Sequence, residues 1–457
     1  MIERMVRLIG IHAGRSHPCA FISIVGVIGV FLFLPGCLPS EGTDQPSLPV
    51  GTTNLSKNGS VSFAPDIASN GEIVYVVWTD IIGDNQEIVL VRSGDGGQTF
   101  SETMNVSETL DPSINAQIAV SGTTVYIVWE EFLSEQAESD IFFRKAEDSN
   151  GGLNWSSKKN ISLSGPVCND SIGPAMDPCP SQFPALAADG ERILVAWSES
   201  VVYEFKEITI EESTGRDFIH VVADIFMLGS SDRGESFQPL GMPPSLSISN
   251  KGNSRSLNPA LAAAPGTFYV AWTDLDTVPP NNQPEHSEIF FRSSDGSVLT
   301  PPIGSSETIL SSPIRGSGSP DLAAGDGNTY LVWEGTPAEA GSCQFGSDIF
   351  LVKSTDGFAT VIGLPTNISN SACRANNGNV SAFGNKVYIV WEDNAPGRSG
   401  LLFRMSQDGG DSFSEAAHLN NTSGSVAAPA VSAQENGLFA VWEDALLGNL
   451  EIFFSKL

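Results

Sequence analysis

One short pattern recurs along this chain and constrains its fold more than any other feature. A run of β-branched and aromatic residues ends in Trp, followed within two positions by an acidic residue, as in VYVVWTD at residues 74–80. Self-similarity at a spacing of this size indicates one supersecondary unit per copy, so the fold is a repeat. Seven of the eight tryptophans occupy this position, at intervals of 51 to 75 residues: Trp78, Trp129, Trp197, Trp272, Trp333, Trp391 and Trp442.

Each copy carries the same neighbours, and together they describe one structural unit. In the first copy a short strand (65–69) precedes the Trp strand, and a third strand (87–91) and a fourth (104–108) follow it. Gly, Asn, Ser and Pro separate the strands, and no helical periodicity persists, which is typical of an all-β chain. Four antiparallel strands form the blade of a β-propeller. The sequence therefore predicts an all-β, seven-bladed β-propeller of four-stranded antiparallel blades.

The corner between the third and fourth strands has a distinctive composition. In SGDGGQTF (93–100) the Asp95 carboxylate can accept backbone N–H groups within its own turn, and the two glycines adopt backbone angles that other residues resist. Phe100 then returns to the apolar layer. The corner recurs nearly intact around Asp232 and Asp408.

These corners closely resemble the Asp-box, S-x-D-x-G-x-T-[FW], of the sialidase and BNR-repeat β-propellers. The resemblance covers residues 54–457 and implies that the corner is a structural turn remote from any chemistry. Sialidases usually have six blades, whereas the Trp pattern occurs here in seven copies. We expect a binding or scaffold module for a glycan or protein ligand, without turnover; the alternative is an exo-acting glycoside hydrolase of sialidase type.

The two ends of the repeat complement each other. The last copy stops at Leu457, directly after its third strand, and TNLSK at residues 53–57 resembles the fourth strands of other copies. We expect residues 53–57 to complete the last blade and close the ring, because this hides a strand edge that would otherwise be exposed. The propeller domain then spans residues 53–457.

The segment before the repeat is typical of an exported protein. Three arginines precede an uncharged apolar run at residues 20–34, which is too short for a comfortable membrane span and typical of a secretory signal. The run ends in LPGC, which resembles the lipobox of prokaryotic lipoproteins and implies lipidation of Cys37. Residues 1–36 are then a signal peptide and residues 37–52 a flexible tether. A plain signal peptide and an uncleaved anchor are the alternatives. We expect a lipid-anchored protein at the cell surface or in the periplasm.

Charge and cysteine content agree with export. The net charge is −30, and removal of residues 1–36 takes away three Arg and one Glu to leave −32, which disfavours nucleic acid as a partner. Four further cysteines predict two disulfides in an exported protein. Cys168 and Cys179 flank one Pro-rich loop, so we expect them to form one disulfide. The other disulfide is then Cys343–Cys373. There is no C-x-x-C motif and the histidines are scattered, so a zinc-type metal site is not predicted.

Three loop arginines are the candidates for ligand binding. Arg255, Arg315 and Arg374 precede the first strands of three successive copies, on the face opposite the Asp95-type corners. Guanidinium groups clustered there could clamp a carboxylate or sulfate; the alternative is three solvated arginines on an acidic protein.

The sialidase resemblance implies a catalytic site as well. It implies three arginines, a Tyr–Glu nucleophile and an Asp acid, but the F-R-I-P motif of that family is absent. Five of the six tyrosines lie in the Trp strands, where packing explains them, and only Tyr203 stands apart. No catalytic residue is assigned on this basis.

Two sets of acidic residues flank the hairpin between the second and third strands. Such a ring could bind Ca²⁺ through oxygen ligands; the alternative is hydrogen bonding to loop amides, with no cofactor. One set closes the Trp strands (Asp80, Glu130, Glu199, Asp274, Glu334, Asp393 and Asp444), and the other opens the third strands (Glu87, Asp140, Asp224, Glu288, Asp348 and Glu451).

The third copy contains an insertion. Polar and apolar residues alternate on both sides of a turn over residues 201–228, which predicts an overlong β-hairpin. Such a hairpin suits contact with a partner protein or with a second copy of the chain; a decorative insertion is the alternative.

Overall fold

The computed structural model describes residues 51–133, 138–149, 151–162, 180–210, 213–240, 247–249, 254–276, 287–295, 299–300, 308–311, 314–337, 346–359, 364–395, 400–419 and 425–457. Every regular element in these ranges is a β-strand, so the all-β prediction is confirmed. No helix in them is long and apolar enough to cross a membrane. The proposed signal peptide and tether, with Cys37, lie outside the described residues, as do Cys168, Cys179 and Cys343.

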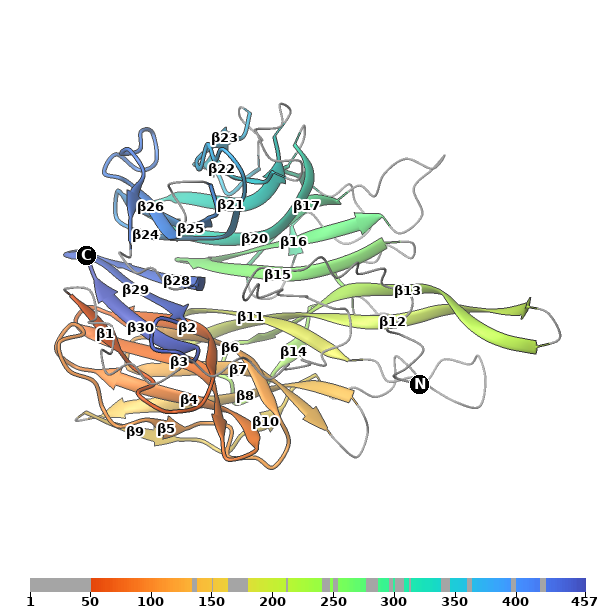
Figure 1. The fold of residues 1–457 in the computed structure, drawn as a ribbon, viewed down its shortest axis with the longest axis horizontal. Coiled ribbons are helices and arrows are strands. Elements are labelled where there is room, and N and C mark those ends of the chain that lie inside the picture. The colour runs from red at the N-terminus through yellow and green to blue at the C-terminus, as the bar shows by residue number, and fades with distance from the viewer. Residues whose placement is uncertain are drawn as a thin grey trace, which may run out of the picture. The chain divides into compact units, whose positions relative to one another are not determined.

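The strands form repeated antiparallel units, one around each Trp strand (Figure 1). In unit 1, strands β2 (Ser62–Asn70), β3 (Ile73–Ile82), β4 (Asn85–Ser93) and β5 (Met104–Asn105) are hydrogen-bonded in chain order. We number the other units in the order of their tryptophans. Unit 2 holds β6 (Ser113–Ser121), β7 (Thr124–Leu133), β8 (Glu138–Ser149), β9 (Gly152–Trp155) and β10 (Lys159–Asn160). Unit 3 holds β11 (Ser181–Asp189), β12 (Arg192–Ile210), β13 (Ser213–Ser230) and β14 (Gln238–Pro239).

The remaining units repeat this order. Unit 4 holds β15 (Ser254–Ala264), β16 (Thr267–Asp276), β17 (Ser287–Ser294), β18 (Leu299–Thr300) and β19 (Thr308–Ile309), and unit 5 holds β20 (Arg315–Gly325), β21 (Asn328–Thr336), β22 (Asp348–Ser354) and β23 (Thr366–Asn367). Unit 6 holds β24 (Ala375–Phe383), β25 (Lys386–Asp393), β26 (Gly400–Ser406) and β27 (Ala417–His418), and unit 7 holds β28 (Val426–Gln434), β29 (Gly437–Asp444), β30 (Glu451–Lys456) and β1 (Thr52–Asn54). Units 3 and 4 share one sheet through a single parallel bridge between Ala223 and Arg255.

The core lies between neighbouring units. Trp78 and Val76 of β3 pack with Phe454 of unit 7 in one buried cluster, whereas Tyr75 of the same strand packs with Trp129 of unit 2. Successive side chains of a strand point to opposite faces, so each Trp strand contributes to two apolar layers. The first strands of successive units contact one another in the order β2, β6, β11, β15, β20, β24 and β28, and β28 also contacts β2.

The N-terminal segment pairs with the last strand. Strand β1 is antiparallel to β30, with Asn54 opposite Phe453, and the Leu55 N–H donates to the Ile452 carbonyl (2.7 Å). Ser56 donates to the Glu451 carboxylate (2.7 Å) and accepts the Ile452 N–H (3.1 Å). The predicted pairing of this segment with EIFFSKL is therefore present in the structure.

The three Asp corners form the turns that the sequence predicts. The Asp95 carboxylate accepts the Thr99 N–H (2.9 Å) and the Thr99 and Ser93 hydroxyls (2.6 and 2.7 Å). These bonds, led by the Thr99 hydroxyl, lower the pKa of Asp95 to about 2. A Cβ at Gly97 would lie 2.3 Å from the ring of Phe454 in unit 7, so this glycine is needed for close approach as well as for its φ of 82°. The turns around Asp232 and Asp408 repeat this hydrogen bonding.

One feature of the fold was not predicted. Each first strand has a register shift near its start, and there a residue other than glycine adopts a left-handed φ of 48–55°. We call these the bulge residues. They are Ala64, Asn115, Phe183, Asn258, Ser319, Asn377 and Ala428.

Candidate functional site

The candidate site lies at the end of the sheets where the Trp strands finish. We call it the arginine end, and we call the opposite end, with the turns of Asp95, Asp232 and Asp408, the Asp-turn end. The β12–β13 hairpin extends beyond the other strands at the arginine end, on the right of Figure 1. The predicted overlong hairpin is thus present, with pairing from Ile193–Ser230 to Ile210–Ser213.

The structure places the three candidate arginines at one equivalent position. Arg255 lies opposite Leu275, and Arg315 lies opposite Thr336, each the third residue after its Trp. Arg374 accepts the N–H of Asn394, the corresponding residue of unit 6, through its carbonyl (2.8 Å). The three therefore share one register in units 4, 5 and 6.

The sequence offset of Arg315 has a structural cause. Arg315 lies four residues before the bulge residue of its unit, whereas Arg255 and Arg374 lie three residues before theirs. An additional register shift between Arg315 and Gly318, with Gly316 at a φ of 57°, absorbs this residue. Glycine suits this conformation because it has no Cβ to clash with the backbone.

The arginines differ in their surroundings. Arg255 is half-buried, and its Nε makes no hydrogen bond to the described residues. Arg374 is exposed and lies near Glu334. Burial raises the pKa of Glu334, while the Asn377 N–H and the charge of Arg374 act in the opposite direction. The side chain of Arg315 is outside the described part of the structure.

A glutamate directly after Trp links one unit to the next. Glu334 accepts the N–H of bulge residue Asn377 (2.7 Å), and Glu443 accepts that of Ala64 (2.6 Å). In unit 2, Glu130 does the same for Phe183 (2.6 Å). These contacts give the bulge residues a partner for a backbone donor that the strand ladder leaves unpaired. We call these glutamates, together with Glu392, the clamp glutamates.

Glu392 is the most heavily hydrogen-bonded clamp glutamate. It accepts bonds from the side chains of Asn376 (2.8 Å) and Asn377 (2.5 Å) and from the Ala428 N–H (2.9 Å). Its charge raises the pKa of Glu334 and of Glu443, although burial is the larger cause in both. For Glu443 the resulting pKa is about 7. Three carboxyl groups of units 5, 6 and 7 thus form one electrostatically coupled row, with Arg374 at its unit 5 end.

The predicted ring of acids divides into groups with different partners. Glu130 and Glu334 directly follow Trp and are clamp glutamates, whereas the acids two places after Trp face serines near the start of their own first strand. Asp80, for example, accepts a bond from Ser62 (3.0 Å). Glu199, Asp274 and Asp393 accept bonds from Ser181, Ser256 and Ser371.

The acids that open the third strands hold the fourth strand in place. Glu87 accepts a bond from Ser107 (2.5 Å), whose oxygen in turn accepts the Ile88 N–H (2.9 Å). The same contact recurs at Asp140, Asp224, Asp348 and Glu451, each with a serine. No group of three His, Cys, Asp or Glu side chains suited to a metal ion occurs among the described residues. The geometry therefore gives these acids hydrogen-bonding partners within the fold.

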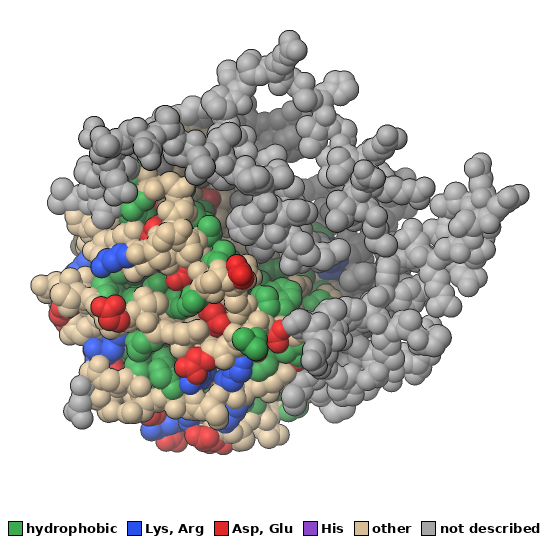
Figure 2. Space-filling model, turned by 60° about the horizontal axis from the view of Figure 1, so that its bottom comes forward, with side chains coloured by type: hydrophobic (Ala, Val, Ile, Leu, Met, Phe, Trp, Pro, Cys, Tyr) green, Lys and Arg blue, Asp and Glu red, His purple; other side chains and the backbone are tan. Residues whose placement is uncertain are grey.

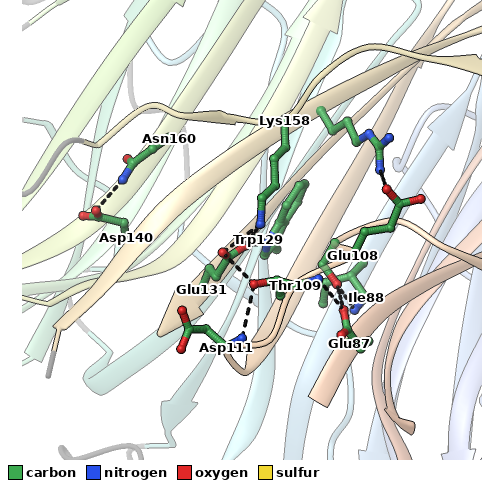
Figure 3. A network of polar contacts seen from close by, with 12 residues as sticks. Glu87, Ile88, Glu108, Thr109, Asp111, Trp129, Glu131, Asp140, Lys158 and Asn160 are labelled. Carbon is green, nitrogen blue, oxygen red and sulfur yellow. Dashed lines mark hydrogen bonds and ion pairs between the residues drawn. The ribbon is translucent and has the colours of Figure 1, made fainter. Parts of the chain in front are cut away.

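Figure 3 shows such a structural carboxylate in unit 2. Glu131 accepts bonds from Lys158 (2.8 and 2.9 Å), Thr109 (3.1 Å) and the Trp129 indole N–H (3.2 Å). Lys158 also lies over the ring of Phe142, 5.0 Å from its centroid. Glu131 is only 3% exposed, so its oxygens are occupied by the fold.

The remaining candidates have structural surroundings. Tyr75, Tyr126, Tyr330 and Tyr388 are buried, and Tyr269 packs against a core cluster, so the packing interpretation is confirmed for these five. Tyr203 lies in β12, and its side chain is outside the described part. Cys373 is disulfide-bonded. The two pairings themselves stay predictions, because the other three cysteines are not described.

The surface charge on one face of the described structure is mixed. On the face turned forward in Figure 2, acidic and basic side chains lie interspersed among polar and apolar ones. A mixed surface of this kind does not concentrate anions. The arginines of units 4, 5 and 6, which share one register, stay our candidates for the capture of an anion.

Repeated four-stranded antiparallel sheets are typical of a β-propeller, and several solved structures are similar to this chain. The polysaccharide lyase Uly1 is similar over 86% of this chain and 89% of its own, with 10% identity and a TM-score of 0.50. An α-L-arabinanase of Penicillium chrysogenum, solved with arabinobiose, is similar over 90% of this chain and 98% of its own, with 12% identity and a TM-score of 0.46. At this low identity, the likeness to Uly1 shows a shared fold and nothing finer.

A sialidase of Trypanosoma rangeli, solved with the inhibitor DANA, is similar at a TM-score of 0.44 and 10% identity. The match covers 90% of this chain but only 60% of the sialidase. The chain matches no protein-family model and no curated protein sequence.

Proposed function

We propose that this protein is an exported carbohydrate-active enzyme, a seven-bladed β-propeller that binds an acidic glycan at the arginine end and hydrolyses a glycosidic bond there. The observation that carries the proposal is the meeting of Arg374 with a coupled row of carboxyl groups, Glu334, Glu392 and Glu443. Arg255 and Arg315 share the register of Arg374 in the two preceding units.

The chemistry of this set suits an acidic sugar. Guanidinium groups bind a carboxylate or sulfate in a fork geometry that lysine does not offer. Hydrolysis of a glycosidic bond needs a carboxylic acid that protonates the leaving oxygen and a carboxylate that assists attack at the anomeric carbon. Glu334, whose pKa burial raises, is our candidate for the acid, and Glu392 is our candidate for the second carboxylate. The polysaccharide lyase Uly1 has a similar fold, which supports a polysaccharide as the class of substrate.

A second candidate function is that of a propeller that binds the same glycan and does not catalyse its hydrolysis. Each clamp glutamate accepts a backbone N–H of the next unit, and Glu130 does so in a unit that carries no candidate arginine. A structural clamp explains this repetition without catalysis. The two candidates share the binding site and differ in the role of Glu334.

The closed ring is part of the proposal. Contact of β28 with β2 and the pairing of β1 with β30 support closure by the N-terminal segment. The charge of Asp66 in unit 1 raises the pKa of Asp321 in unit 5, so these carboxyl groups lie near each other although their units are not adjacent in the series. First strands that surround a common axis account for this proximity.

The test uses purified protein, a glycan array and a hydrolysis assay on sialosides and on uronic acid polysaccharides. Arg374→Ala should weaken binding by about ten- to a hundredfold, since one charge-assisted contact contributes roughly 1.5–3 kcal/mol. Glu334→Gln should abolish turnover and keep binding. The matched control is Arg233→Ala, which removes a half-exposed arginine at the Asp-turn end. Binding without turnover by the parent protein selects the second candidate, and no binding to any acidic glycan refutes both.

Export and anchoring are proposed on the sequence alone. Cys37 follows the apolar run and is our candidate for lipidation. Cells that express the full chain should incorporate an alkyne-labelled palmitate into the protein, and Cys37→Ser should abolish the label. An unlabelled protein that is still exported would favour a plain signal peptide.

A further inference from the structure

A cavity of about 700 Å³ opens at the Asp-turn end, away from the arginines. Three hairpin turns surround it: those between β2 and β3, β24 and β25, and β28 and β29. Its location at this end follows from the backbone bond between the Gly96 N–H of the Asp95 turn and the Glu72 carbonyl (2.8 Å), because Glu72 lines the cavity. The volume is in the range of small-molecule sites, about 300–1,000 Å³.

Hydrogen bonds fix the polar groups at the inner part of the cavity. Gln434 donates to the Ser69 hydroxyl (2.6 Å), and the Ser69 and Ser432 hydroxyls are hydrogen-bonded to each other (2.5 Å). The Ser381 hydroxyl accepts the Ala433 N–H (2.9 Å). These side chains come from β2, β24 and β28, so three units hold hydroxyl and amide groups in set positions. A fixed set of donors and acceptors binds a polar ligand with little loss of side-chain entropy.

The rim supplies an aromatic surface and little net charge. Phe383 lines the cavity and is 44% exposed, which is unusual for a phenylalanine that packing alone would explain. Lys456 is the single basic residue of the lining, and it pairs with Glu72 (3.4 Å). Glu435 adds a negative charge, so the lining does not favour an anion.

We infer that this cavity binds a neutral sugar unit. A pyranose or furanose ring has an apolar C–H face and a rim of hydroxyl groups. Phe383 can cover the apolar face, and the side chains of Asn436 and Gln434 can donate to and accept from the hydroxyls. The site is separate from the arginine end and does not depend on the function proposed for it. It would hold a neutral part of a polysaccharide, or a second chain, at the opposite end of the protein.

Titration calorimetry with the whole protein tests this site. The probes are maltopentaose, cellopentaose, xylopentaose, chitopentaose and arabinopentaose, each up to 10 mM. We expect at least one to bind, and Phe383→Ala to weaken that binding at least tenfold. Asn436→Ala should weaken it as well, and both residues are exposed, so neither change should unfold the protein.

Two controls make the result specific. Leu364→Ala removes another exposed apolar side chain, 78% exposed and outside the cavity lining, and should leave binding unchanged. Arg374→Ala should also leave it unchanged, which separates this site from the arginine end. The inference is overturned if none of the five oligosaccharides binds, if Phe383→Ala binds like the parent, or if Arg374→Ala removes the binding.

Discussion

The clamp glutamate of unit 2 makes stability depend on pH in a direction that can be worked out. Glu130 is 1% exposed, and burial raises its pKa from 4.5 to about 7 against the opposing bonds from Asn115 and Phe183. The folded-state pKa lies above the unfolded one, so the stability linked to this group is fully present below pH 4.5 and is lost as the pH rises through 7. The difference corresponds to about 3 kcal/mol.

We expect Glu130→Gln to remove this dependence. Its side-chain oxygen can still accept the Phe183 N–H and the Asn115 amide, which both bind the same carboxylate oxygen of Glu130 (2.6 and 2.9 Å). When the pH rises from 5 to 8, the free energy of unfolding should therefore fall less for the variant than for the parent, by roughly 2–3 kcal/mol.

Urea unfolding at pH 5, 6, 7 and 8, followed by the fluorescence of the fully buried tryptophans, measures this difference. The control is Glu102→Gln, which removes an exposed carboxyl group near the Asp95 turn and should keep the parent's slope. Equal pH slopes for Glu130→Gln and the parent would show that the clamp is not a buried, proton-binding carboxylate.

Three further predictions concern the frame of the fold. Deletion of residues 46–60 removes β1 and the serine bonded to Glu451, so the melting temperature in calorimetry should fall by many degrees, and an unchanged melt would contradict the pairing. The bonded pairs Cys168–Cys179 and Cys343–Cys373 should each contribute roughly 3 kcal/mol, measured by unfolding of Cys-to-Ser variants, and free thiols in protein from an oxidising compartment would refute them. Asp95→Ala should lower the melting temperature and leave acidic-glycan binding at the arginine end unchanged; a parallel loss of that binding would mean that the two ends are not independent.

The sequence predicted the repeat because the residues that define it are also the residues that the fold buries. Each Trp strand contributes to two layers, so its Trp and its alternating aliphatic residues cannot vary freely, and they are visible as a pattern. The Asp95 turn was equally visible, since its bonds are local and depend on Asp, Ser and Thr at fixed spacing. The pairing of residues 53–57 could be predicted because these residues repeat the N-x-S pattern whose serine holds a third-strand acid.

The bulge residues and the clamp glutamates could not be predicted in the same way. Bulge positions are occupied by residues as different as Ala64, Phe183 and Asn377, so no single side-chain type marks them in the sequence. Different roles for Glu130 and Glu131 could not be predicted either, because these two glutamates are adjacent in one strand. Their roles differ because successive side chains of a strand face opposite sides: Glu130 reaches the next unit, and Glu131 stays beside Trp129.

The distribution of clamp glutamates gives the arginine end its charge pattern. Glutamate follows Trp in units 2, 5, 6 and 7, whereas Thr79, Ser198 and Thr273 take this place in units 1, 3 and 4. The hydroxyls of these three residues are buried and form no hydrogen bond to the part of the chain that the structure describes, so a shorter side chain there does not replace the clamp.

The clamps are thus absent beside two of the three arginines. Arg255 follows the unit that has Ser198, and Arg315 follows the unit that has Thr273; Arg374 alone has a clamp glutamate, Glu334, in the preceding unit. A carboxylate at all three joints would neutralise the arginines and lower their attraction for an anion. At the joints before units 4 and 5 a hydroxyl residue takes the place of the clamp glutamate, so no clamp carboxylate adds negative charge beside Arg255 or Arg315. Under the function proposed above, an anionic group would for this reason bind at the joints before units 4 and 5, beside the unit that contains Glu334, our candidate for the acid.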